Sequence, residues 1–235
     1  MIINGLGYTD KPLSMTTEFF EQLPTEDLLG VGIDAESLNQ HRLGRALDAV
    51  YEYDTTKLFS ELAARAAVQD NVDQSRQALD TTSFSLTGRY DVDFDVEAVK
   101  VVHGYSKNHR ADLKQVVTEL VVSPDGGVPL FFKAHDGKKS DSRIFRERCD
   151  QIAKHFNANK EASLSADSKL YFEKNADNLK EIDFVTRIPN TISELESIVS
   201  DALGREQSWQ ISPKGINHKS FRVSHYGIEQ NWFVC

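Results

Sequence analysis

The spacing of apolar residues divides the chain into two regions with different periods. Over the first seventy residues the spacing is helical, which predicts two amphipathic helices over 43–53 and 54–68, the second capped by Asp54 or Thr55. Their apolar stripes are Leu43, Ala46, Leu47 and Val50 in the first, and Leu58, Phe59, Leu62 and Ala66 in the second. We expect a helical hairpin, serving either as a packing module or as a DNA-binding helical domain.

The polar, turn-prone segment QDNVDQSRQ (69–77) predicts a domain boundary, because the period changes to two after it. Segments rich in Val, Thr, Phe and Tyr then favour strands. The expected strands are QALDTTSFSL (77–86), AVKVVHGYS (98–106), LKQVVTELVV (113–122) and VPLFFKAH (128–135), with a turn at 124–127.

Helices and strands alternate farther along the chain. A helix over 140–156, capped by Ser140 or Asp141, precedes a short strand ending near Asp167 and a helix from about Leu170. A strand over 182–189 and a helix over 191–203 follow; Thr191 and Glu194 form its capping box, and Gly204 ends it.

An antiparallel meander followed by parallel βαβ units is the order of a ribonuclease-H-like fold, although other mixed α/β sheets share it. The predicted class is therefore α/β, a mixed sheet preceded by a small helical domain, with bounds at 1–74 and 75–204. The segment 209–235 resumes β-prone stretches and ends on WFVC. We expect this end to be an unpaired strand of a chain that stops inside a domain.

Composition narrows the setting. No apolar run is long enough for a membrane span, and the first fifteen residues lack the features of a secretory signal. Two cysteines without CxxC spacing favour a reducing cytoplasm over a disulfide framework or zinc cluster. The net charge of −9 argues against nucleic acid as a partner, yet residues 101–150 hold 9 basic and 7 acidic side chains, which allows a local basic face.

Carboxylates are the best candidates for chemistry, since the chain has no Walker loop, GxGxxG, HExxH or GxSxG motif. Asp91, Asp93 and Asp95 alternate as cation ligands would, but they also suit a solvated loop. Asp80 would end the first strand and Asp167 the short strand after the helix over 140–156, and these two strands are neighbours in the predicted sheet. There they could hold Mg²⁺; otherwise each is a turn or N-cap residue.

Several motifs resemble those of insertion-sequence DDE transposases with a GYSKDHRPDLKQ signature. They are ALDTTSFSLTG, HGYSKNHRADLKQVV and ADSKLYFEKN…FVTRIP, and the helical amino-terminal region is similar as well. Asn108 and Ala111 replace the usual Asp and Pro, and Asn231 replaces an expected Arg.

The resemblance implies a ribonuclease-H-like core in which two Asp and one Glu hold two divalent ions, Mg²⁺ or Mn²⁺. Asp80 matches the first acid and Asp167 the second. The third is expected beyond residue 235, after a β-rich insertion of which 205–235 would be the start. Neither Glu194 nor Glu196 is favoured as a substitute. The chain would then be truncated before its last catalytic acid.

The function implied is DNA transposition by metal-dependent phosphoryl transfer at insertion-sequence ends, with little or no activity in the fragment itself. DNA would be the partner, together with a second copy of the chain, in a prokaryotic cytoplasm near the nucleoid and not at a membrane. Lys107, His109, Arg110 and Lys114 would contact phosphates, unless Arg110 and Asp112 only brace a turn. The alternatives are a non-catalytic DNA-binding or interaction fragment that pairs with full-length transposase, and an unrelated metal-dependent nuclease.

Overall fold

A computed structural model describes residues 12–90, 98–105, 110–156, 163–204 and 209–235. The chain forms two compact units, residues 1–61 and 62–235, which divide within helix α5 (Thr55–Gln69). Within these described ranges, no helix is both long and apolar enough to cross a membrane.

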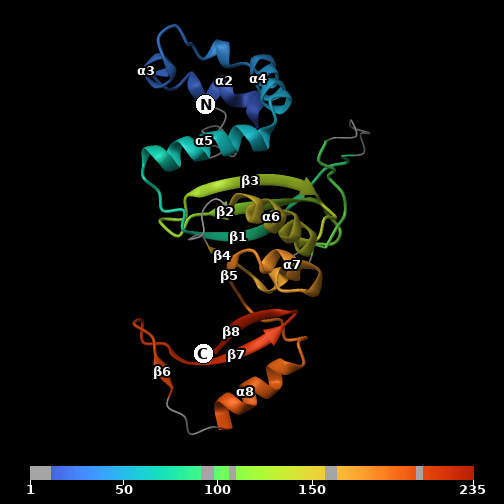
Figure 1. Cartoon of the computed structure of the whole chain (residues 1–235). Coiled ribbons are helices and arrows are strands. Elements are labelled where there is room, and N and C mark those ends of the chain that lie inside the picture. Colours follow the sequence, from blue (N-terminus) through green and yellow to red (C-terminus); the bar gives the residue numbers. More distant parts are fainter. Residues whose placement is uncertain (1–11, 91–97, 106–109, 157–162, 205–208) are drawn as a thin grey trace. The chain divides into compact units, whose positions relative to one another are not determined.

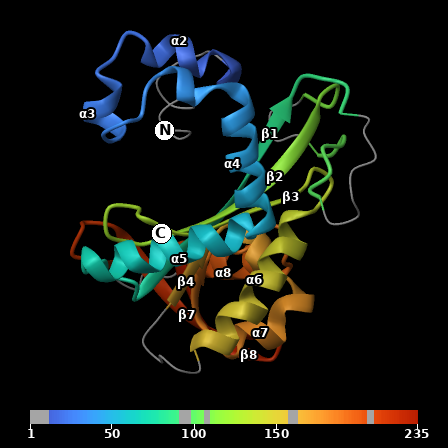
Figure 2. The same ribbon diagram turned by 90° about the horizontal axis from the view of Figure 1, so that it is seen from above.

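The first unit is helical. Its elements are η1 (Leu13–Met15), α2 (Thr16–Phe20), α3 (Thr25–Leu29), η2 (Glu36–Leu38) and α4 (Gln40–Glu52), followed by the start of α5 (Figure 2). The two predicted helices are confirmed. Asn39 caps α4 by accepting from the Arg42 N–H, and Asp54 caps α5 by accepting from the Thr56 N–H. The predicted stripe of α4 is only partly buried, because Leu43 is enclosed but Leu47 is 41% exposed.

The second unit is built on a five-stranded mixed sheet. Its strands are β1 (Arg76–Leu86), β2 (Lys114–Val122), β3 (Pro129–Asp136), β4 (Ser163–Ala166) and β5 (Asp183–Thr186), in the spatial order β3-β2-β1-β4-β5 (Figure 1). β1 pairs antiparallel with β2 and parallel with β4, while β2–β3 is antiparallel and β4–β5 is parallel. The sheet therefore has the predicted ribonuclease-H-like order.

Three expected elements differ in the structure. Residues 98–105 form no strand but a single bridge from Val102 to Gln115. The helix expected from Leu170 is replaced by η3 (Ser168–Leu170), η4 (Glu173–Asn175) and the short α7 (Ala176–Leu179). Helix α8 (Glu194–Gly204) begins three residues after Thr191, so Thr191 is not its cap; a turn from Pro189 to Ile192 precedes it and buries Ile192 in the core.

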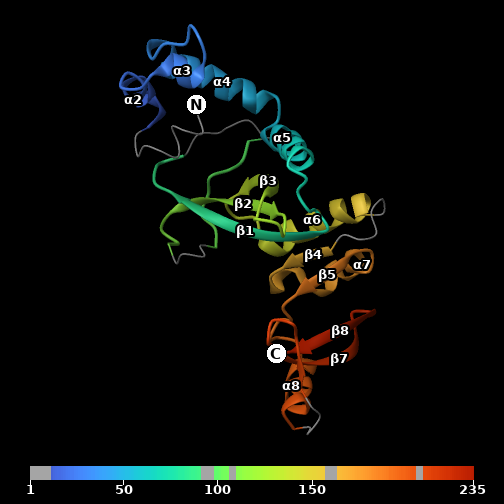
Figure 3. The same cartoon turned by 90° about the vertical axis from the view of Figure 1, so that its left-hand side faces the viewer.

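The carboxy-terminal residues form a paired hairpin, contrary to the expected unpaired strand. β7 (Asn217–His225) pairs antiparallel with β8 (Ile228–Val234) (Figure 3). β6 (Gln210–Ile211) pairs with β7 (Figure 1). The two-residue turn takes positive φ at Tyr226 and Gly227, the geometry that suits the twist of a hairpin. Trp232 of β8 is buried in the main core, which explains an apolar end to this segment.

The core lies between the sheet and helix α6 (Asp141–Phe156), which also contacts η3 and α7 (Figure 2). Alternate residues of β1 and β2 point into it, as expected for a sheet covered on one face. The buried apolar members are Leu79, Val117, Val121, Ile144, Phe145, Cys149, Leu164, Leu170, Tyr171, Leu179, Ile182, Ile192 and Trp232.

A buried ionic network joins α6 to the sheet. The Glu119 carboxylate on β2 is 2% exposed and accepts from Arg148 Nε of α6 and, at 2.9 Å, from His135 Nε2 of β3. The Arg148 guanidinium also stacks on Phe131, 3.4 Å from the ring centroid. Burial alone would raise the pKa of Glu119, but these hydrogen bonds and the Arg148 charge outweigh it and lower the pKa below its ordinary value.

We expect Glu119→Gln to lower the free energy of unfolding at pH 7 by about 3 kcal/mol, because Arg148 then keeps a buried charge without a counter-ion. A carboxylate with a lowered native pKa stabilises the fold above its ordinary pKa of 4.5 and loses that effect as pH falls through the native value. The gap between variant and wild type should therefore persist from pH 7 to pH 5 and narrow below it, as measured by urea unfolding.

The matched control is Glu147→Gln, which removes a half-exposed carboxylate bound to Lys139 and Arg143. It should cost less than about 1 kcal/mol. Equal stability of Glu119→Gln and wild type at pH 7 would contradict a stabilising network.

Candidate functional site

The β1–β4 pairing places Asp80 next to Asp167. The last pair in register is Leu79 with Ala166, and Asp80 and Asp167 are the residues that come next along the chain. Asp167 keeps an extended backbone, with φ −70° and ψ 179°, so the chain keeps the direction of β4 for one residue beyond the last pair. One expectation was wrong, because Asp80 lies in the middle of β1, paired with Leu120 of β2, and not at the end of the strand. What ends at Asp80 is only the pairing with the shorter β4.

Both carboxylates lie on the sheet face opposite α6. Leu79 and Thr81 are buried and Asp80 is exposed; the Thr81 hydroxyl donates to Asp141 in the first turn of α6, at 2.8 Å. Since side chains alternate along a strand and residues side by side in register share a face, Asp167 lies on the face of Asp80. Its exposure agrees with this placement.

Backbone groups hold both side chains in place. Asp80 Oδ1 accepts from the Thr81 N–H at 2.7 Å, and Asp167 Oδ1 accepts from the Lys169 N–H at 2.8 Å. The second contact caps η3, so Asp167 is an N-cap as its alternative interpretation predicted. The Thr186 hydroxyl on β5 donates to the Asp167 carbonyl at 2.7 Å, which fixes the backbone at the end of β4. One oxygen of each carboxylate is therefore used locally and the other is available.

The donor set suits a hard divalent cation. Among the described residues, no Lys, Arg or His side chain forms an ion pair with Asp80 or Asp167, so their negative charges have no protein counter-ion. Two carboxylates of this kind can hold Mg²⁺ or Mn²⁺, with water and phosphate oxygens as further ligands.

In the described part of the chain, no group of three His, Cys, Asp or Glu side chains completes such a site. Glu194 is committed elsewhere, since its carboxylate accepts from Ser193 Oγ at 2.9 Å and lies 3.4 Å from His225 Nδ1. The backbone and Ser193 hydrogen bonds lower its pKa.

The expected DNA-contact residues are only partly described. Lys107 and His109 lie outside the described residues, as do Asp91, Asp93 and Asp95. Arg110 makes a two-pronged contact with Asp112, with N–O distances of 2.8 and 2.7 Å, and this hydrogen bond lowers the pKa of Asp112 to about 2. Lys114 donates to the Arg89 carbonyl. Arg110 thus braces the turn, and its contact with DNA stays a prediction.

One residue of the GYSKNHRADLKQ segment, Gln115, is buried and has a structural role. Its carboxamide is 1% exposed and donates to the Tyr105 carbonyl at 3.1 Å and to the Gly137 carbonyl at 2.7 Å. A Cβ on Gly104 would collide with the Gly137 carbonyl, so only glycine allows this approach. Sequence reasoning missed this role of Gln115; a polar residue at the start of the apolar run QVVTELVV was the only available signal.

Cys149 is not placed to act as a nucleophile. Cys149 is fully enclosed on α6, and burial raises the pKa of its thiol to about 11. The thiol is therefore protonated and inaccessible at neutral pH.

We expect Gly104→Ala to lower the free energy of unfolding by about 1–3 kcal/mol, because the new methyl group must displace the Gly137 carbonyl or the Gln115 side chain. Urea unfolding of the full chain measures this. Gly204→Ala is the control, since a Cβ at this helical position meets no atom within 4 Å and should leave the stability unchanged or slightly higher. Equal stability of the two variants would contradict the close approach.

Comparison with solved structures finds transposases at low identity. The piggyBac transposase synaptic complex with hairpin DNA matches at 10% identity and TM-score 0.37, over 56% of this chain and 26% of that chain. The Mos1 transposase paired-end complex with left transposon end matches at 12% and 0.31, over 86% and 67%. The Mos1 mariner paired end complex with Mn matches at 11% and 0.32, over 83% and 65%. This chain thus spans about a quarter of the piggyBac chain and about two thirds of the Mos1 chains.

No curated protein matches the sequence. Residues 1–64 match a family described as "Domain of unknown function (DUF4277)". Residues 72–232, which hold the whole mixed sheet and both aspartates, match a family model described as "Transposase DDE domain". The chain therefore belongs to the transposase DDE domain family.

Proposed function

We propose that this chain takes part in DNA transposition by metal-dependent phosphoryl transfer at the ends of an insertion sequence, with Asp80 and Asp167 as metal ligands. One observation carries the proposal. The β1–β4 register sets two carboxylates side by side, on one exposed face, without a protein counter-ion among the described residues. Two aspartates with a purely structural role would not stabilise the fold by lying side by side, because their like charges repel each other.

The protein's own groups orient the reaction centre. The Thr81 and Lys169 N–H groups each bind one carboxylate oxygen, which limits the rotation of the two side chains. Asp80 lies within β1, and the Thr186 hydroxyl holds the backbone of Asp167 directly after β4, so both proposed ligands are fixed by the sheet. A bound divalent ion would activate the attacking hydroxyl and stabilise the leaving oxygen of the phosphodiester.

DNA is the proposed partner, with a second copy of the chain across paired ends and a prokaryotic, nucleoid-associated cytoplasm as the setting. Lys107, His109, Arg110 and Lys114 are the proposed phosphate contacts. For Arg110, contact with DNA requires release from Asp112, so Arg110 should contribute less to the affinity for DNA than a basic side chain without an ion-pair partner. The domain bounds at 74 and 204, with a β-rich insertion starting at 205, also stay proposals.

A second function is favoured by the shortage of acidic ligands. Since no third carboxylate joins the pair among the described residues, the chain alone would bind metal weakly. It would then act as a non-catalytic DNA-binding fragment that pairs with full-length transposase.

The test is cleavage of a supercoiled plasmid that carries the terminal repeats of the encoding element, with Mn²⁺ present. We expect only weak nicking at the repeats, and it should fall to background in Asp80→Asn and Asp167→Asn, because even outer-sphere changes at metal sites cost about 10–100-fold. DNA binding in EDTA should be unchanged in both.

Asp183→Asn is the matched control, because this exposed aspartate begins β5 and should leave the rate of nicking unchanged. Nicking that survives in Asp80→Asn would refute the assigned ligands. Binding to the repeats without nicking by any form would favour the non-catalytic fragment.

A further inference from the structure

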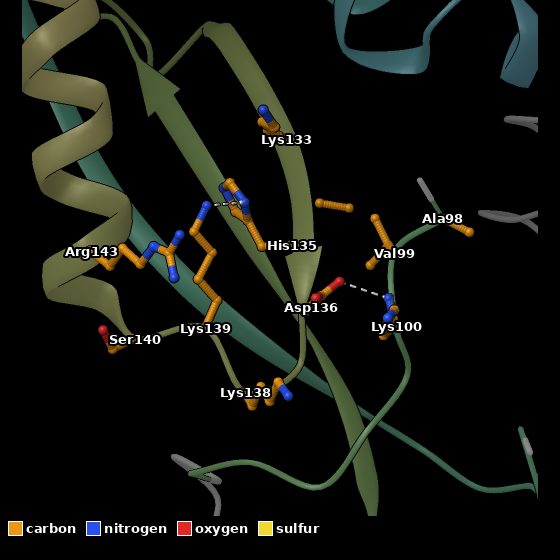
Figure 4. A pocket seen from close by; sticks show the side chains of 11 residues that line it. Ala98, Val99, Lys100, Lys133, His135, Asp136, Lys138, Lys139, Ser140 and Arg143 are labelled. Atoms are coloured by element: carbon orange, nitrogen blue, oxygen red, sulfur yellow. Dashed lines mark hydrogen bonds between the residues drawn. The ribbon is translucent and has the colours of Figure 1, made fainter. Parts of the chain in front are cut away.

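A cavity of about 630 Å³ opens at the edge strand β3, away from the aspartate pair. Figure 4 shows its wall, made by the end of β3, the turn into α6 and the segment at 98–100. Its charged lining consists of the cations Lys100, Lys133, Lys138, Lys139 and Arg143 and the carboxylate of Asp136. In a chain of net charge −9, this concentration of positive charge is unexpected and calls for an anionic ligand.

Three of the five cations have no ion-pair partner among the described residues. In the described ranges, Lys100, Lys133 and Lys138 have no carboxylate within ion-pair distance of their ammonium groups. Asp136 instead accepts from the backbone N–H of Lys100 at 2.8 Å, which fixes the 98–100 segment against β3 (Figure 4). Among the described residues that line it, the cavity therefore has more cations than carboxylates.

The buried network fixes the base of the cavity. Lys139 Nζ lies 3.2 Å from His135 Nδ1 and 2.5 Å from Glu147 Oε2, while His135 Nε2 faces Glu119. Lys139 donates to both neighbours, and an ammonium carries three N–H donors, so one remains for a ligand. Arg143 shares the same Glu147, at 3.1 Å. The buried His135 thus positions Lys139, and the half-exposed Glu147 holds both Lys139 and Arg143.

The lining favours a phosphate over a base or a peptide. It offers ammonium groups as point charges, and it has no aromatic ring other than His135 for base stacking. Its only apolar members are Ala98, Val99 and Ala134, too few for an apolar side-chain anchor. Such a site recognises the DNA backbone without reading its sequence.

We propose that the cavity lined by Lys100, Lys133, Lys138 and Lys139 binds backbone phosphates of DNA. The bound stretch would flank the part of the same duplex that lies at the aspartate pair. This inference rests on the proposed function for the identity of its partner. Lys133 of β3 is paired in register with Glu119 of β2, which is paired with Thr81 of β1. Because β3 is the second strand from β1, Lys133 lies about 10 Å from Thr81 across the sheet. Because Lys133 lies on the α6 face and Asp80 on the other, one phosphate cannot occupy both sites.

The test compares a Lys133→Gln/Lys138→Gln double variant with wild type in binding a fluorescent 30-base-pair duplex, in EDTA and over a range of salt concentrations. We expect the slope of log K against log salt to fall in magnitude by about 1.8, which is two phosphate contacts, and the affinity at 100 mM salt to fall roughly tenfold or more. The loss should be equal for an element-end duplex and a scrambled one.

Lys174→Gln/Lys214→Gln is the matched control, since both lysines are exposed, lie outside the cavity and have no ion-pair partner in the described residues. An equal loss in this control, or an unchanged slope in the cavity variant, would overturn the proposal. The proposal would also be overturned if the cavity variant lost affinity for poly-glutamate but not for DNA, because the ligand of the cavity would then be an acidic protein. Urea unfolding should show the same stability for all forms.

The two proposals fail in different experiments. Binding without metal does not need Asp80 or Asp167, so a lower salt slope without any nicking would keep the phosphate site and reject the catalytic assignment. Absence of DNA binding by the wild-type chain would reject both.

Discussion

The parallel pairing of β1 with β4 is the constraint on which the candidate site depends. It covers only four residue pairs and ends at Leu79 and Ala166. Asp80 and Asp167, the residues that come next, are placed near each other by this last pair. A shift of the register by one residue would turn one carboxylate to the α6 face. The register is in turn specified by burial, because Leu79 and Leu164 must point into the core.

The carboxylates on the two faces of the sheet differ in whether they have counter-ions. On the α6 face, Glu119 is buried and fully compensated by Arg148 and His135, which binds helix to sheet. On the open face, Asp80 and Asp167 are exposed and uncompensated among the described residues. At the β3 edge, Lys139 links the buried network to a cavity with excess positive charge. The compensated charge inside supports the fold, and the two uncompensated surfaces are the ones proposed to bind ligands.

The sequence allowed the sheet order and the proximity of the two aspartates to be predicted, because strand period, helix caps and turns are local signals. The turn at 124–127 and the cap at Asp54 follow from such signals. The missed features depend on contacts between distant residues. Residues 98–105 are β-prone, yet the approach of Gly104 to Gly137 and the buried Gln115 hold them as a loop. Lys100 and Lys133 become neighbours only through the fold, so spacing could not reveal their cavity.

The central claim is that Asp80 and Asp167 share a divalent ion, and the most direct measurement is the anomalous scattering of Mn²⁺ in crystals of the full chain. The account predicts a peak between the two carboxylates, about 2.0–2.3 Å from an oxygen of each, that disappears in Asp80→Asn. A well-diffracting crystal in Mn²⁺ with no peak at this pair, or with carboxylates on opposite faces of the sheet, would contradict it.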